Sequence, residues 1–143
     1  MTITQTSPAL SDYRHWVFDM DGTLTEAVHD FALIRRVLEI PPEADILHHL
    51  ASLPADQAAA KHAWLLEHER ELAWTARAAP GAVELVRALQ AAGCQLGMLT
   101  RNARELAQLT LQAIGLHDAF AWDSIVGRDE AAPKPAPDGL QYF

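Results

Sequence analysis

The chain has 143 residues and a mass of 15.7 kDa, which allows one domain or one small core with an insertion. Half of the residues are hydrophobic and 21% are charged, so a disordered or fibrous chain is excluded and a globular fold is expected. The formal net charge of -8 opposes broad electrostatic binding to nucleic acid or to anionic lipid. A phosphate-bearing ligand would therefore need a local cluster of basic residues.

A single cysteine, Cys94, excludes an internal disulfide framework and a zinc site made of several cysteines. It fits a reducing compartment, so a cytoplasmic protein is expected. Residues 1–11 do not resemble a secretory leader, and no apolar run approaches the ~20 residues that a membrane span needs. Neither a membrane nor a nucleic acid is expected as a partner.

The first predicted element is a strand at 15–18, where an aromatic and β-branched run ends in a tight turn at Asp19-Met20-Asp21-Gly22. Helices are predicted next. Apolar residues recur at helical spacing from 30 to 40, around 46–50, and from about 52 to 76. Residues 28–78 are therefore predicted to be wholly helical.

The second half of the chain is predicted to alternate helices and strands: a helix at 82–93, a strand at 95–100, a helix at 102–115 and a strand at 120–126. Asn102, with Glu105 three residues later, is typical of a helix start. Pro133, Pro135 and Pro137 predict a closing loop. This order predicts an α/β fold with an all-helical insertion after its first strand.

The first chemistry-bearing pattern is the acidic pair Asp19 and Asp21. In an extended segment, positions i and i+2 face the same side, so both carboxylates can point at one small volume where the strand ends. One carboxylate could attack a substrate while the other handles the proton. The alternative is structural, because Asp-Gly is ordinary turn chemistry and Thr25 could cap a helix.

Three motifs in order resemble the signatures of the haloacid dehalogenase superfamily of phosphohydrolases. The string Asp19-Met20-Asp21-Gly22-Thr23-Leu24-Thr25 after an apolar strand resembles the first. The strand 96–100 followed by Arg101-Asn102 resembles the second. Lys134, within Pro133-Lys134-Pro135-Ala136-Pro137, resembles the third in the context of the phosphoglycolate-phosphatase-like branch.

The resemblance implies a role for each matching residue. Asp19 would be the nucleophile that forms an aspartyl-phosphate, and Asp21 the general acid and then base. Thr100 and Lys134 would bind the phosphoryl group and offset its charge. The phosphate-binding set would also include Gly22, Arg101 and Asn102. Asp19 and the carbonyl of Asp21 would hold Mg²⁺, which prefers oxygen ligands.

The resemblance also implies a Rossmann-like parallel sheet whose core comprises residues 1–27 and 79–143, with residues 28–78 as a small helical cap that selects a small phosphorylated metabolite. The family has a fourth, acidic signature on a later strand, expected roughly 15 to 30 residues beyond Lys134 by ordinary element lengths. Residues 127–130 contain an acidic pair but precede Lys134. The chain is therefore expected to be a truncated member.

Truncation leaves alternatives open. The strand at 15–18 would become an exposed apolar edge, through which a homo-oligomer could form. The chain could be an inactive or non-catalytic fragment that binds phosphate weakly or self-associates. A phosphoglucomutase-like phosphotransferase or a dehalogenase would be the nearest other enzymes, and Asp21 argues against the dehalogenase.

Two further groups of residues receive a structural interpretation. Arg35 and Arg36 could reach a substrate carboxylate, but adjacent arginines on a helix favour a solvated face. The histidines of the helical block match no metal-ligand spacing, and His68 on an apolar stripe is expected to be packed.

Overall fold

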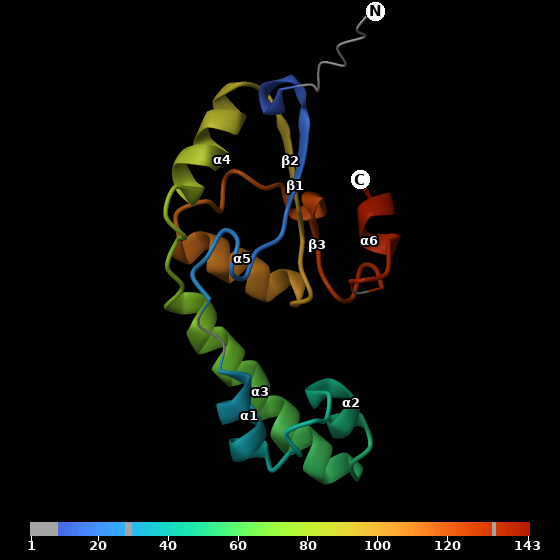
Figure 1. Ribbon diagram of the computed structural model, residues 1–143. Helices are drawn as coiled ribbons and strands as arrows, with labels where there is room; N and C mark the ends of the chain where they lie inside the picture. Colours follow the sequence, from blue (N-terminus) through green and yellow to red (C-terminus); the bar gives the residue numbers. More distant parts are fainter. Residues whose placement is uncertain (1–8, 28–29, 133) are drawn as a thin grey trace, which may run out of the picture.

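The computed structural model describes residues 9–27, 30–132 and 134–143, so Pro133 and the first two residues of the predicted cap lie outside the described part. Its centre is a parallel sheet in the order β1 (His15–Phe18), β2 (Gln95–Leu99) and β3 (Ile125–Val126) (Figure 1). Phe18 pairs with Met98, and Met98 pairs with Ile125. The sheet confirms the predicted α/β fold.

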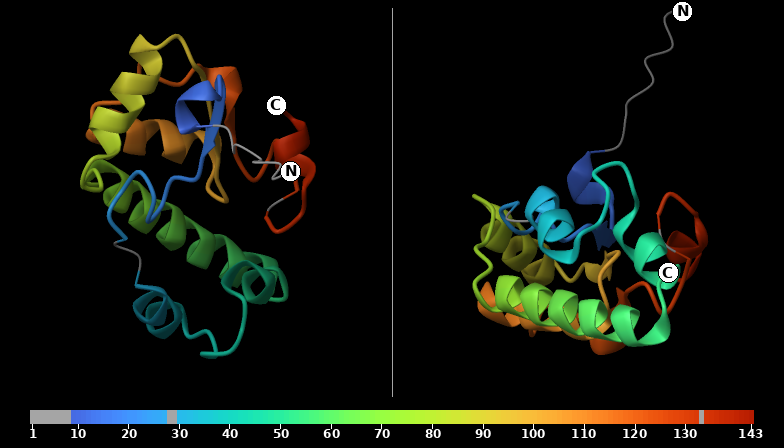
Figure 2. Two further views of the ribbon diagram at one scale, coloured as in Figure 1. Left: turned by 45° about the horizontal axis from the view of Figure 1, so that its top comes forward. Right: turned by 90° about the horizontal axis from the view of Figure 1, so that it is seen from below.

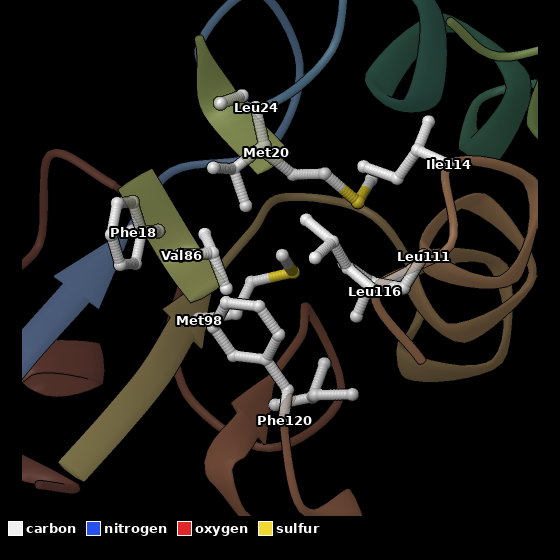
Figure 3. Packing of buried hydrophobic residues seen from close by; sticks show 12 residues of the cluster. Phe18, Met20, Leu24, Val86, Met98, Leu111, Ile114, Leu116 and Phe120 are labelled. Carbon is white, nitrogen blue, oxygen red and sulfur yellow. The ribbon is translucent and has the colours of Figure 1, made fainter. Parts of the chain in front are cut away.

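One face of the sheet packs against α4 (Ala82–Ala91) and α5 (Arg104–Ala113) (Figure 1). Phe18 and Met98 point to this face because side chains alternate along a strand. They meet Val86 of α4 and Leu111 of α5 in a cluster that also holds Met20 (Figure 3). This apolar cluster fixes the two helices relative to the carboxyl ends of the strands.

The other face of the sheet lies beside the short helix α6 (Asp138–Gln141) (Figure 1). A Cβ at Gly97 would overlap the ring of Phe143, and a Cβ at Gly139 would overlap the side chain of Leu99. Glycine at 97 and 139 therefore allows the C-terminal segment to approach β2 closely.

The helical block consists of α1 (Phe31–Leu38), α2 (Ile46–Ala51) and α3 (Ala55–Trp74). Asp30 caps α1 and Asp45 caps α2, because each carboxylate accepts a bond from a backbone N–H three residues later. The block has its own buried cluster, made of Ile34, Leu38, Ile40, Leu50 and Leu65. α3 runs alongside α5, which joins the block to the sheet layer (Figures 1 and 2).

Three local predictions differ from the structure. The third strand spans only Ile125–Val126, because a 3₁₀ turn at Trp122–Ser124 replaces its first part, as Asp and Ser favour. α5 begins at Arg104 with Ala103 as its N-cap, so Asn102 does not cap it. The helix α6 was not predicted. A further 3₁₀ turn, Leu10–Asp12, precedes β1.

No helix in the described part of the chain has the length and apolar character required to cross a membrane.

Candidate active site

The acidic turn after β1 places Asp19 and Asp21 on one side of Met20. The Met20 side chain is fully buried in the sheet cluster, and its carbonyl oxygen accepts bonds from the backbone N–H groups of residues 23, 24 and 25. Gly22 completes the turn with a φ of 76°, a value that favours glycine. Because Met20 points into the core, its two acidic neighbours remain outside the core.

Lys134 neutralises the first carboxylate. Its Nζ donates to Oδ1 of Asp19 over 2.9 Å and to the carbonyl oxygen of Leu99 over 3.3 Å. Arg101 donates from Nη2 to the carbonyl oxygen of Lys134 over 2.9 Å. The lysine is thus held between the ends of β1 and β2, where its charge would also face an anion placed beside Asp19.

Asn102 connects three parts of the site. Its Nδ2 donates to Oδ2 of Asp21 over 2.7 Å, and its backbone N–H donates to Oγ1 of Thr100 over 3.1 Å. Its carbonyl oxygen accepts a bond from the backbone N–H of Arg128 over 3.1 Å. Asn102 therefore orients the second carboxylate instead of capping α5, which corrects the prediction from its spacing to Glu105.

A cavity of about 720 Å³ is lined by all the residues that were predicted to form the site. These residues come from the turn after β1, from the end of β2 and from the loop after β3; they are Asp19, Asp21, Gly22, Thr100, Arg101, Asn102 and Lys134. The rest of the wall comes largely from the helical block. The structure thus brings the predicted site residues together at one edge of the sheet.

Arg128 and Glu69 are cavity residues that sequence reasoning missed. Arg128 follows β3 and Glu69 lies on α3, and their closest side-chain atoms are 3.8 Å apart. The acidic string at 127–130 drew attention to this segment, but Glu130 pairs with Arg104 over 3.1 Å and accepts a bond from the backbone N–H of Gly127. Only the fold reveals the contact of Arg128 with α3.

Arg35 corrects the expectation of a solvated face. Its side chain is half-buried and lines the cavity, and its Nε donates to the carbonyl oxygen of Ala44 over 3.2 Å. Arg36 is exposed and does not line the cavity. The two neighbours differ because successive residues on a helix point about 100° apart, so only one of them faces the cavity.

The described histidine that the sequence places on an apolar stripe is packed against an aromatic ring. His68 stacks on Trp64 with ring centroids 4.9 Å apart, as a packed histidine should. Among the described residues, no group of three or more His, Cys, Asp or Glu side chains is arranged to hold a metal ion.

The pKa values of two paired residues outside this cavity are shifted. Arg87 donates two bonds to the carboxylate of Asp118, at 2.9 and 3.0 Å. These hydrogen bonds hold the pKa of Asp118 below its ordinary value of 3.8 and raise the pKa of Arg87.

The parallel sheet, the paired carboxylates at its carboxyl edge and the helical block beside them define an α/β protein with a candidate active site at the sheet edge. Residues 13–143 match the family model of the haloacid dehalogenase-like hydrolases. The chain belongs to this family. The match confirms the resemblance that the three signatures indicated.

Known proteins resemble the chain in sequence, and solved structures resemble it in fold. A haloacid dehalogenase-like hydrolase domain-containing protein of Arabidopsis thaliana is 30% identical to this chain over an alignment of 151 positions. The alignment covers 96% of this chain and 59% of the relative. The chain thus spans less than two thirds of that protein. The crystal structure of a predicted phosphoglycolate phosphatase from Haemophilus somnus matches 94% of this chain and 71% of its own, with a TM-score of 0.69 and 21% identity. The crystal structure of a hydrolase of the family from Deinococcus radiodurans contains bound phosphate and sodium. The match covers 92% of this chain and 66% of that protein, with a TM-score of 0.60 and 20% identity.

Proposed function

We propose that this hydrolase cleaves phosphomonoesters of small metabolites through an aspartyl-phosphate on Asp19. The observation that carries the proposal is the 2.9 Å contact of Lys134 with Asp19 inside a cavity that also contains Asp21. A lysine beside a nucleophilic carboxylate offsets the repulsion between that carboxylate and a phosphate dianion. The Deinococcus radiodurans hydrolase, which has bound phosphate, supports the same ligand class.

The proposed mechanism has two displacements. A carboxylate oxygen of Asp19 attacks phosphorus as the bond to the leaving alkoxide breaks, and Asp21 gives its proton to that alkoxide. Asp21 then removes a proton from water, which attacks phosphorus and releases Asp19 and inorganic phosphate. Asn102 orients Asp21 for both steps through the 2.7 Å hydrogen bond. Thr100 and Lys134 bind the phosphoryl oxygens.

The donor set at the acidic turn fits Mg²⁺. Asp19 and the backbone carbonyl of Asp21 offer hard oxygen ligands, and a cation that keeps several waters needs few protein ligands. When bound, Mg²⁺ would offset negative charge on the phosphoryl group. The chain's own contribution is the placement of Asp19 beside Lys134.

The experiment compares phosphomonoester hydrolysis by the wild type and by Asp19→Asn, with and without Mg²⁺. Asp19→Asn should lower turnover by roughly 10³-fold or more, because the nucleophile is lost. Asp56→Asn, at an exposed position on α3, is the matched control. Full activity of Asp19→Asn, or undiminished activity in excess chelator, would contradict the assignment.

Assays on the same samples distinguish three alternatives. A wild type that binds inorganic phosphate but turns over no ester is a non-catalytic phosphate-binding chain. Transfer of the phosphoryl group to a sugar phosphate instead of water would identify a phosphoglucomutase-like phosphotransferase. Release of halide from a haloacid would identify a dehalogenase.

We also propose that residues 28–78 act as the cap that selects the substrate. Much of the cavity wall that this block provides is apolar, including Phe31 and Leu47. Asp19 and Lys134 also line the cavity, but they do not belong to the helical block. Phe31→Ala and Leu47→Ala should change the relative kcat/KM values of esters with large and small apolar groups. Hydrolysis of the smallest ester should be retained, and a uniform change across all esters would contradict the cap.

A further inference from the structure

The loop after β3 is held against the candidate active site at Arg128. The backbone N–H of Arg128 donates to the carbonyl oxygen of Asn102 over 3.1 Å, and the side chain of Asn102 holds Asp21 over 2.7 Å. A Cβ at Gly127 would lie 2.6 Å from the same carbonyl oxygen, so glycine allows this close approach. The side chain of Arg128 therefore extends from a fixed point and lines the same cavity as Lys134.

The guanidinium of Arg128 is held only by charge. Its Nη2 atom lies 3.8 Å from Oε2 of Glu69 on α3, whereas an N–H···O hydrogen bond is about 3 Å long. The two side chains are 28% and 16% exposed, so their charges interact more strongly than they would in bulk water. Glu130 of the same loop is engaged elsewhere, because it pairs with Arg104 and accepts the backbone N–H of Gly127. Arg128 thus has a counter-charge but keeps N–H donors for a closer acceptor.

Other cations that line the cavity are fixed by hydrogen bonds. Lys134 donates to Oδ1 of Asp19 and Arg101 donates to the carbonyl oxygen of Lys134, each over 2.9 Å. Arg35 donates to a backbone carbonyl oxygen over 3.2 Å. A guanidinium held by charge alone exchanges its partner for another anion at a lower cost, because no hydrogen bond to the first partner is lost. Arg128 is therefore suited to move to an anion that enters the cavity.

We propose that Arg128 binds the phosphoryl group and that Glu69 competes with phosphate for it. When a phosphate dianion lies beside Asp19 and Lys134, the guanidinium turns from Glu69 to the phosphate oxygens, which it can bind through two parallel hydrogen bonds. Because Glu69 belongs to α3, phosphate binding also releases a charge contact between the loop after β3 and the helical block. The inference rests on the proposed function, which places phosphate at Asp19.

Calorimetry with inorganic phosphate tests the inference without turnover. Arg128→Met should bind phosphate about tenfold or more weakly, and Arg128→Lys should retain part of the affinity. Glu69→Gln should bind phosphate about threefold or more tightly, because Arg128 loses its competing carboxylate. When Arg128 is already replaced by methionine, Glu69→Gln should change the affinity little. A gain of equal size in both backgrounds would show that Glu69 acts by general repulsion of phosphate, and this would overturn the inference.

Two variants provide matched controls. Glu71→Gln removes the same charge from an exposed position of α3 that lies about 200° around the helix from Glu69. Arg77→Met removes an exposed cation outside the cavity. Both should bind phosphate as the wild type does, and a thermal melt of each variant shows whether it is folded.

The outcomes separate this inference from the proposed function. If the wild type hydrolyses esters and binds phosphate but folded Arg128→Met binds phosphate equally well, the inference alone fails. If the variants change phosphate binding as expected but the wild type hydrolyses no ester, the proposed function fails and the inference about Arg128 stands. A wild type that does not bind phosphate would overturn the inference as well.

Discussion

The Nζ atom of Lys134 lies 2.9 Å from Oδ1 of Asp19, although 115 positions separate the two residues. Because the strands are parallel, their carboxyl ends meet at one edge, and the loop after β3 returns to that edge. The lysine is also bonded to the carbonyl oxygen of Leu99, so its ammonium is confined to the junction of β1 and β2. Residues remote in sequence thus form one charged pair.

Removing this ammonium should lower turnover more than stability. We expect Lys134→Met to reduce kcat/KM for phosphomonoesters roughly 10²- to 10³-fold, because a charge that stabilises the transferring phosphoryl group is lost. Steady-state kinetics with a thermal melt of each variant provides the measurement. Arg77→Met removes an exposed cation outside the cavity and should leave the rate unchanged. Equal rates for Lys134→Met and the wild type would remove Lys134 from the mechanism.

Asn102 should affect the chemical step more than binding. Asn102→Ala deletes the 2.7 Å hydrogen bond to Asp21, so we expect kcat to fall about tenfold with a small change in KM. Asn102→Asp places a third carboxylate beside Asp21 and should be slower still. A rise in KM at constant kcat would show that Asn102 contributes to binding instead.

The ion pair of Arg104 and Glu130 should contribute to stability. Both side chains are largely buried, at 14% and 16% exposure, and Arg104 also donates to the carbonyl oxygen of Ile125 and lies over the ring of Trp122. Glu130→Gln leaves the buried guanidinium without its counter-charge, so the free energy of unfolding should fall by about 3 kcal/mol. Urea denaturation measures this change.

An exposed pair provides the comparison. Glu67 and Arg70 lie 4.0 Å apart on the surface of α3. Glu67→Gln should change the free energy of unfolding by less than about 0.5 kcal/mol. Similar losses for Glu67→Gln and Glu130→Gln would show that burial does not strengthen the pair with Arg104.

The bond between Arg87 and Asp118 predicts a pH-dependent contribution to stability. The pKa of Asp118 is lowered in the folded protein, so the contribution is present above the ordinary value of 3.8 and is lost as the pH falls through the lower folded value. Asp118→Asn should therefore lower the urea midpoint at neutral pH. The difference between the variant and the wild type should disappear as the pH falls below the folded pKa of Asp118. Asp123→Asn removes a carboxylate from an exposed residue that belongs to none of the described ion pairs, and it serves as the control.

The edge of the sheet predicts self-association. Among the described residues β1 pairs only with β2, and the Val17 side chain on this edge strand is 38% exposed. We propose that two chains associate through β1, and Val17→Lys should weaken this association because an edge lysine opposes strand pairing. Sedimentation velocity at several concentrations measures it, with Val37→Lys on α1 as control. A wild type that stays monomeric at every concentration would contradict this interface.

The sequence predicted most elements because their signals are local. The helical spacing in 30–40, 46–50 and 52–76 corresponds to α1, α2 and α3, and the acidic turn follows β1 as expected. The third strand was predicted too long because Phe120 is apolar for packing, not for pairing: it lies in the sheet cluster outside β3. Burial and strand pairing leave the same apolar signal in a sequence.

The site was less accessible to sequence reasoning where contacts are non-local. The carboxylates and Lys134 were found because ordered motifs contain them. Asn102 was placed in the phosphate-binding set, but its spacing to Glu105 favoured a helix cap and hid its bond to Asp21. The sequence did not show which of the adjacent Arg35 and Arg36 faces the cavity, and it did not indicate that Arg128 does, because only the folded arrangement places these side chains.

Because the helical block has its own, smaller apolar cluster, we expect it to differ in local stability from the sheet layer. Its cluster contains fewer buried residues than the sheet cluster, so α1 and α2 can open at a lower free energy than the strands. Amide hydrogens in these helices would then exchange with solvent while those of β2 remain protected. Such an opening removes one wall of the cavity and leaves the acidic turn folded, so a ligand can enter by partial unfolding of the helical block alone.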